Sequence, residues 1–396
     1  MTDRRLAMDW LRIGAFALLI LYHVGMFYVS WDWHVKSSRA SEAIEPLMQL
    51  VNPWRLTLLF VISGLATRYL SDKMAAGAFL GSRAWRLLPP VLLAVFVIVP
   101  PQTYFEIVEN GVSIDWGTFY QRYVTASGGW RYENGAPIIT PTYNHMWFVV
   151  YLVVYTLALA ALAPLLRRIP ARALAAVSNG LWLILGPVAF LWAARAALFP
   201  IFGETHALID DWYLHAIYFA AFAFGFAIAK FDGFFAACMR QRWIALTLAL
   251  CSYAAVQGLQ AVFGDAAAIP DSVRFAGRGL LALQAWGAII TLIGFAQRHL
   301  SAQDGPIRRY MTEAIFPFYI VHQTVIVVVG HYLDPLQLPL WLEAAILIGA
   351  TAAACCATYE IVRRIGFLRP LFGLKALPRR KSVEARLVRG HIEGEA

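Results

Sequence analysis

The sequence predicts an all-α integral membrane protein with about ten transmembrane helices and both termini in the cytoplasm. Three observations lead to this fold class. Of the 396 residues, 60% are hydrophobic and only 14% are charged, whereas soluble domains carry about 25% charged residues. The mean hydropathy is +0.60, and the apolar residues gather in long segments. Lysine and arginine residues alternate with those segments, as the positive-inside rule requires.

Ten segments contain the roughly twenty mostly apolar residues that a helix needs to cross a bilayer. We place them near residues 9–30, 54–71, 87–105, 145–166, 178–199, 212–229, 243–263, 275–296, 312–331 and 340–360. The third segment has Pro89, Pro90, Pro100 and Pro101 towards its ends. Because proline removes a backbone donor, we expect kinks or irregular turns at these ends.

The net charge of +9 and the pI near 9.5 would also suit a nucleic-acid-binding protein. The distribution of the charge argues against nucleic acid, because most lysines and arginines lie between apolar segments on one predicted side of a bilayer. That side is the cytoplasm, and the lipid bilayer is the expected partner. We expect residues 1–374 to form the membrane domain and residues 375–396 a basic cytoplasmic tail.

The first apolar segment carries an arginine and a histidine on one helical face. Arg12 and His23 are eleven residues apart, which is about three helical turns and about 16 Å along the axis. An ionisable side chain inside a membrane span is costly and usually functional. A histidine that only bonds to a neighbouring helix is the alternative. His322 lies halfway along the ninth segment, and histidine can accept and return a proton near neutral pH.

A second group of candidates lies toward the cytoplasmic side. Arg83 and Arg86 are three residues apart and project from one face of a helical turn, so two guanidinium groups could grip phosphates. Ordinary positive-inside charge is the alternative, and Arg68 nearby would strengthen an anion pocket. Ser63, next to Gly64 in the second segment, is a nucleophile candidate, but small residues in spans more often permit close helix packing.

The long outer loop, near residues 106–144, is rich in tryptophan and tyrosine. Aromatic rings suit stacking against sugars, and an aromatic belt at the membrane interface explains them equally well. We expect no metal site, because the histidines and cysteines lack close ligand spacing. The sequence also contains no Walker-type phosphate loop and no serine-hydrolase elbow.

Taken together, the motifs resemble those of the membrane acyltransferases of the acyltransferase-3 family, in order and spacing along nearly the whole chain. The matching residues are Arg12 and His23, the stretch Leu59–Gly64 that ends in Ser63-Gly64, Arg83 with Arg86, the stretch His145–Phe148, and the stretch Tyr319–His322. Within the family, Tyr28 and the stretch Trp33–Val35 resemble a branch that adds succinyl groups to osmoregulated periplasmic glucans.

This resemblance implies a multi-pass enzyme of the bacterial inner membrane with no permanently bound cofactor. It would take an acyl group from cytoplasmic acyl-CoA, with succinyl-CoA as the expected co-substrate, and esterify a sugar hydroxyl of a periplasmic glucan. His23 would be the catalytic base or carry the acyl group, and His322 would orient it or bind the acyl carbonyl. The donor site would comprise Arg12, Ser63, Arg68, Arg83 and Arg86. The acceptor or acyl-carboxylate site would comprise Trp33, His34, Arg55, His145, Trp147, Arg195 and Arg278.

Other functions remain open at this stage. A relative could transfer acetyl groups to another cell-envelope glycan, which would keep the family but change the donor and acceptor. A transporter of anionic glycans or lipids would also have many spans and buried arginines, but internal repeats are expected there and none is evident. A sensor or scaffold gives no reason for the Arg12 and His23 spacing. The sequence leaves open whether the chain forms a homo-oligomer.

Overall fold

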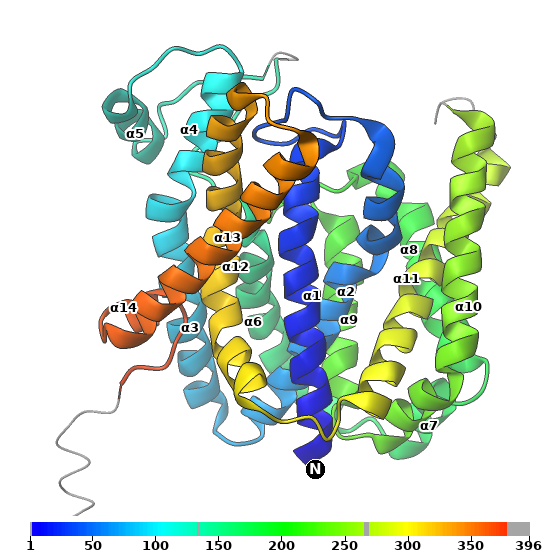
Figure 1. Ribbon diagram of the computed structural model, residues 1–396. Helices are drawn as coiled ribbons and strands as arrows, with labels where there is room; N and C mark the ends of the chain where they lie inside the picture. Colours follow the sequence, from blue (N-terminus) through cyan, green and yellow to red (C-terminus); the bar gives the residue numbers. More distant parts are fainter. Residues whose placement is uncertain (1, 133–134, 265–268, 378–396) are drawn as a thin grey trace, which may run out of the picture.

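The computed structural model describes residues 2–132, 135–264 and 269–377, and these parts of the chain are helical with no β-sheet (Figure 1). In the described residues, nine helical segments are long and apolar enough to span a membrane. The longer helices are α1 (Thr2–Tyr28), α2 (Glu45–Ser71), α3 (Ala76–Leu93), α4 (Pro100–Glu109), α6 (Trp147–Arg167), α8 (Trp182–Phe202), α9 (Trp212–Ile228), α10 (Asp232–Phe263), α11 (Asp271–His299), α12 (Pro306–Leu333) and α13 (Leu340–Arg364). The shorter ones are α5 (Trp116–Val124), α7 (Ala171–Val177) and α14 (Leu368–Leu371).

The all-α membrane architecture is confirmed, and each of the ten predicted segments overlaps one or more helices. The cytoplasmic placement of both termini stays a prediction. Helix α9 is apolar but only 17 residues long, so it is shorter than the other nine spans. Several helices extend beyond the predicted segments, and α2 begins at Glu45 and α10 at Asp232. Hydropathy marks only the apolar part of a helix, whereas backbone hydrogen bonding continues into its polar ends.

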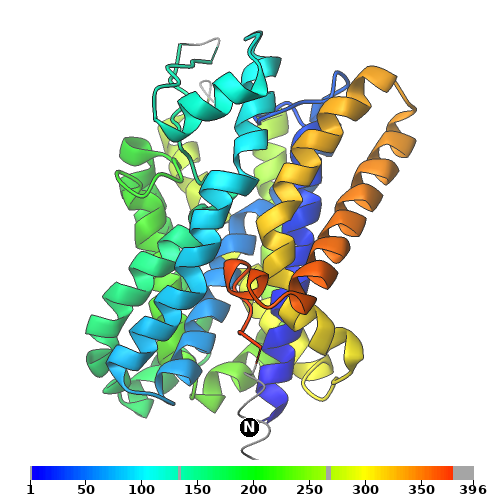
Figure 2. The same ribbon diagram turned by 90° about the vertical axis from the view of Figure 1, so that its left-hand side faces the viewer.

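The long helices stand side by side in one bundle, with α1 in the middle of the face seen in Figure 1. Helices α12, α13 and α3 lie on one side of α1, and α10 and α11 lie on the other. The N-terminal end of α1 is at one end of the bundle. Helices α4 and α5 are at the opposite end, as both views show (Figure 2). The predicted tail falls outside the described residues from 378 onward, so the domain division stays a prediction.

Two glycines let α2 and α9 approach closely. A Cβ atom on Gly64 would lie 2.0 Å from the backbone oxygen of Phe222, and one on Gly225 would lie 2.1 Å from that of Val61. No side chain fits at either position. Gly64 therefore serves packing, as small residues commonly do between membrane helices.

The third span is interrupted where proline was expected to disturb it. A π-helical turn, η2 (Ala94–Ile98), joins α3 to α4 just before Pro100 and Pro101. The hydroxyls of Tyr123, Tyr120 and Thr324 donate to the carbonyls of Val95, Phe96 and Ile98. These side-chain donors satisfy backbone carbonyls of the turn, because Pro100 and Pro101 have no backbone N–H group to donate to it. At Pro89 and Pro90, by contrast, helix α3 continues.

The long loop that follows α4 forms a small hydrophobic cluster of its own around α5. Phe119, Tyr123 and Trp130 are buried against one another, whereas Trp116 remains 44% exposed. Asp115 accepts a hydrogen bond from the backbone nitrogen of Thr118 and so caps the N-terminus of α5. Tyr123 and Trp130 are thus core residues of this cluster. Neither sugar stacking nor a lipid-facing belt accounts for these two side chains.

Candidate active site

His23 of α1 and His322 of α12 are in direct contact, although they lie 299 residues apart in the chain. The Nδ1 atom of His23 is 2.7 Å from the Nε2 atom of His322. Their rings are nearly parallel, with an interplanar angle of 8° and centroids 5.0 Å apart. His322 is fully buried and His23 is partly exposed. The sequence does not fix which faces of α1 and α12 pack together, so this contact is decided by the tertiary structure.

The hydrogen bonds determine which nitrogens carry protons. The Nδ1 atom of His322 lies 2.7 Å from the carbonyl oxygen of Tyr319. Because a carbonyl only accepts, Nδ1 of His322 is protonated, and Nε2 of a neutral His322 is an acceptor. His23 then donates from Nδ1 to that acceptor. The Nε2 atom of His23 is left unprotonated and is able to take a proton from a ligand.

His23 opens onto a cavity of about 430 Å³, which we call the histidine cavity. Helices α1, α2, α6 and α12 and the loops after α1 and α8 form its walls. Its lining includes His23, Trp33, His34, Arg55, His145, Trp147, His206, Tyr319 and Gln323. Five of the seven residues predicted for the acceptor or acyl-carboxylate site therefore line a single cavity with the predicted base.

A polar network holds one wall of the histidine cavity. The Nδ1 atom of His34 is 2.8 Å from a carboxylate oxygen of Glu106, and the Tyr132 hydroxyl donates to the other oxygen at 2.6 Å. The amide of Gln323 donates to Nε2 of His34 and to the side-chain oxygen of Gln102, at 3.0 and 3.1 Å. Both ring nitrogens of His34 are thus occupied within the protein. Burial and the neighbouring Glu106 raise the pKa of Tyr132, which keeps its hydroxyl protonated as a donor.

His145 is tied to the backbone of α12. Its Nε2 atom lies 3.0 Å from the carbonyl of Ile320, and Tyr319 donates from its hydroxyl to the carbonyl of His145. Its ring also meets the His322 ring edge to face, with centroids 5.3 Å apart. The hydrogen bonds of His145 therefore position the helix that carries His322. Trp147, two residues later, packs against His206 with ring centroids 4.4 Å apart.

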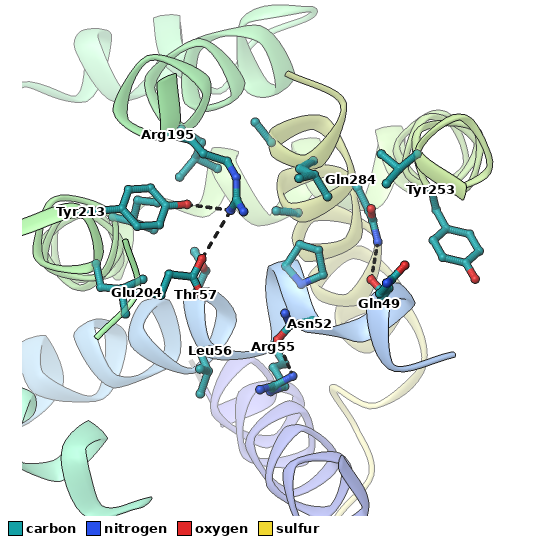
Figure 3. Close-up of a pocket in the computed structure, with 18 of the residues that line it drawn as sticks. Gln49, Asn52, Arg55, Leu56, Thr57, Arg195, Glu204, Tyr213, Tyr253 and Gln284 are labelled. Atoms are coloured by element: carbon teal, nitrogen blue, oxygen red, sulfur yellow. Dashed lines mark hydrogen bonds and ion pairs between the residues drawn. The ribbon is translucent and has the colours of Figure 1, made fainter. Parts of the chain in front are cut away.

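A second cavity of about 360 Å³ lies next to the first, and we call it the glutamine cavity. Figure 3 shows Arg195, Tyr213 and Glu204 on one side and Gln49, Gln284 and Tyr253 on the other. Arg55 lines both cavities. Arg278, the remaining predicted arginine, is 3.4 Å from the carbonyl of Ala196 and does not belong to either lining.

Arginines also gather toward the cytoplasmic end predicted for α1 and α3. Arg12 lies 3.5 Å from Asp9 and 3.4 Å from the carbonyl of Thr312. Arg86 is close enough to both Arg12 and Arg83 for their charges to repel. In the described part of the chain, Arg83 and Arg86 have no carboxylate within ion-pair distance, and the buried Nε atom of Arg83 has no hydrogen-bond partner.

The expected grouping of Arg68 with this cluster is not what the structure contains. Arg68 pairs with Asp72 at 3.0 Å, and Asp72 also binds Arg167 and Lys230. These contacts make a separate ion network at the end of α2, in which Arg68 already has its counter-charge. Ser63 is partly buried on α2 and lines neither cavity. Its proposed part in donor binding stays a prediction.

Sequence reasoning missed Gln102, Glu106, Asn144 and Gln323. Asn144 donates to the side-chain oxygen of Gln102 at 3.0 Å and thereby joins the network around His34. A signal for two of them was present, since Gln323 directly follows His322 and Glu106 directly follows the predicted third segment. Within the described residues, no group of three or more histidines, cysteines or carboxylates could hold a metal ion.

A bundle of membrane-length helices that encloses a histidine pair beside a polar cavity defines the class of the protein as an integral membrane protein. The chain belongs to the acyltransferase-3 family, because the family model described as "Acyltransferase domain" matches residues 5–360. It is therefore a membrane acyltransferase by family.

Proteins similar to it include "Glucans biosynthesis protein C" of Escherichia coli strain K12 and of Escherichia coli O157:H7. Each is 22% identical over 398 residues, which covers 97% of this chain and 98% of the relative. No solved structure matches the chain.

Proposed function

We propose that this protein is an inner-membrane O-acyltransferase. It transfers a succinyl group from cytoplasmic succinyl-CoA to a hydroxyl group of a periplasmic glucan. The observation that carries the proposal is the His23–His322 pair, which leaves Nε2 of His23 free as a base on a cavity wall. The name of the similar proteins supports a glucan as the acceptor. The branch resemblance of the first outer loop supports succinyl as the acyl group.

The donor enters from the cytoplasmic end in this proposal. Coenzyme A carries several phosphates. Arg83 and Arg86 lack counter-ions in the described chain, and Arg86 lies close enough to both Arg83 and Arg12 for their charges to repel. A bound phosphate relieves that repulsion, and planar guanidinium groups bind phosphate with two parallel hydrogen bonds. The pantetheine arm then extends between the helices toward His23.

The acyl transfer follows from the protonation of the histidine pair. The sugar hydroxyl gives its proton to Nε2 of His23 as its oxygen attacks the thioester carbonyl carbon. The carbon–sulfur bond then breaks, and the leaving thiolate takes the proton from Nε2. The products are the sugar ester and free CoA. His322 accepts the hydrogen bond from Nδ1 throughout and stabilises the imidazolium. An acyl group carried on the same Nε2 atom is the alternative route.

The acceptor reaches His23 from the other end. The glutamine cavity offers amide groups from Gln49, Gln257 and Gln260 and aromatic rings from Trp31 and Tyr253. Such a lining suits a sugar chain, since amides bond to hydroxyls and aromatic faces cover the apolar sides of sugar rings. The glutamine cavity and the histidine cavity share lining residues, among them Tyr22, Arg55 and Glu204. The shared wall supports a glucan that extends from one cavity into the other.

The test is acyl transfer by the purified protein in nanodiscs, with succinyl-CoA or acetyl-CoA and a periplasmic glucan. We expect glucan-dependent CoA release, an ester detected by mass spectrometry, and loss of both in His23→Ala. His331→Ala on α12 is the matched control and should keep the activity. Preference for acetyl-CoA would move the protein to another branch of the family. Glycan binding without turnover of either donor would refute the enzyme and favour a transporter.

A further inference from the structure

The three arginines predicted for the acceptor or acyl-carboxylate site, Arg55, Arg195 and Arg278, differ in their partners. Arg195 lies 3.6 Å from a carboxylate oxygen of Glu204 and donates to the hydroxyl of Tyr213 at 2.8 Å. Arg278 donates only to a backbone carbonyl among the bonds described for it, and it lies away from both cavities. Arg55 is the arginine that reaches both cavities and has no carboxylate within ion-pair distance in the described chain.

Arg55 is held rigidly in this position. Its side chain is 7% exposed, and its Nη1 atom donates to the side-chain oxygen of Asn52 at 2.8 Å. The guanidinium carbon lies 3.3 Å above the centroid of the Tyr22 ring. These contacts fix the plane of the group but supply no negative charge. The buried Nε atom also has no hydrogen-bond partner in the described residues.

A buried cation without a counter-ion is expensive, so the site favours an anion. Two acidic residues line the same cavity, Asp32 and Glu204. Glu204 lies close enough to Arg55 for their charges to attract, but its ion pair is with Arg195. Asp32 lies in the exposed loop after α1 and makes no ion pair with Arg55. The charge of Arg55 is therefore available to a ligand carboxylate.

The position of Arg55 places that carboxylate near the reaction. The guanidinium group of Arg55 stacks on the ring of Tyr22, and Tyr22 directly precedes His23 in α1. Arg55 and His23 both line the histidine cavity. An acyl group with its thioester carbon at His23 and a carboxylate at its far end can reach both side chains at once.

We propose that Arg55 binds the free carboxylate of a dicarboxylic acyl donor, and that this contact selects a succinyl-type donor over acetyl. The inference rests on the proposed function and names its specificity residue. It also has a consequence for the rate. An unpaired guanidinium repels a positive charge that forms on His23 in the same cavity, and a bound carboxylate removes that repulsion. Neutral acyl groups should therefore react more slowly even at saturating donor.

The experiment compares three donors on the intact protein in nanodiscs: succinyl-CoA, acetyl-CoA, and the amide of succinyl-CoA, which has the same shape without the charge. For the parent protein we expect kcat/KM with succinyl-CoA to exceed kcat/KM with the amide by about 30-fold or more. This ratio corresponds to the lower end of the free-energy cost of removing one partner of a buried charge pair. Arg55→Gln should abolish that preference while keeping acetyl transfer. Arg55→Lys should retain part of the preference for the carboxylate.

Arg122→Gln is the matched control, because Arg122 is an exposed arginine of α5 and its loss removes the same charge from the same end of the bundle. It should leave the donor preference unchanged. The inference is overturned if the parent protein uses the amide as well as succinyl-CoA, or if Arg55→Gln keeps the preference. A rise in the glucan KM that is equal for all donors would assign Arg55 to the acceptor and also overturn it. If the parent transfers from no donor, the proposed function itself fails; the preceding outcomes overturn the inference alone.

Discussion

Replacing His322 tests the tautomer argument directly. The side chain does not line the histidine cavity, so His322→Ala removes no contact with a substrate. It removes the 2.7 Å acceptor of His23 Nδ1. We expect kcat to fall while the KM for acyl-CoA stays nearly unchanged, because the base loses its orientation and not its binding pocket.

The size of the effect follows from two contributions. A buried N–H group left without an acceptor costs about 1–3 kcal/mol, which corresponds to roughly 5- to 150-fold in rate. His23 is then also free to place its hydrogen on Nε2, where it cannot act as a base. In a Ser-His-Asp triad, the wrong histidine tautomer lowers kcat about 10⁴-fold. We therefore expect kcat to decrease roughly 10²- to 10⁴-fold.

The assay is steady-state CoA release with a saturating glucan acceptor. His322→Gln is the informative companion variant, because its amide oxygen can reach the place of Nε2 and should restore part of kcat. His331→Ala, on the same helix, should behave as the parent protein. A His322→Ala variant with unchanged kcat, or one altered only in KM, would refute the orienting role.

Three further predictions concern the donor site, the helix packing and the response to acid. Arg83→Ala and Arg86→Ala should each raise the KM for acyl-CoA by roughly tenfold or more with little change in kcat. The reason is that a charge-assisted hydrogen bond contributes about 1.5–3 kcal/mol. Steady-state kinetics at two salt concentrations will test this. Gly64→Ala should abolish stable folding, because its Cβ would lie 2.0 Å from a carbonyl oxygen of α9. Gly14→Ala, which meets nothing within 4 Å, should raise or preserve the melting temperature. Burial lowers the pKa of His206 to about 4 in the folded protein, whereas the pKa of an unfolded histidine is about 6.5. The unfolded chain therefore binds a proton at His206 at a higher pH than the folded protein does. The free energy of unfolding should fall as the pH drops from about 6.5 to 4. His206→Gln should flatten that slope in thermal unfolding, and an equal slope in both proteins would contradict the assignment.

The sequence by itself determined the membrane spans. Apolar length is a local property, and every predicted segment overlaps one or more helices of the structure. It also identified His23 and His322 as candidates, because an ionisable residue in a span is rare enough to stand out. The two prolines that begin α4 predicted the break in the third span for a similar reason, since proline acts on its own backbone.

Only the tertiary structure decided how these residues combine. The contact between His23 and His322 depends on which faces α1 and α12 present to each other. Helical periodicity fixes the faces of one helix but not its neighbours. The same reason explains why Arg68 belongs with Asp72 and not with Arg83, and why Arg55 has no counter-ion of its own. Neighbours are chosen by the packing of the whole bundle, including the close fit at Gly64, and that packing is a non-local property of the chain.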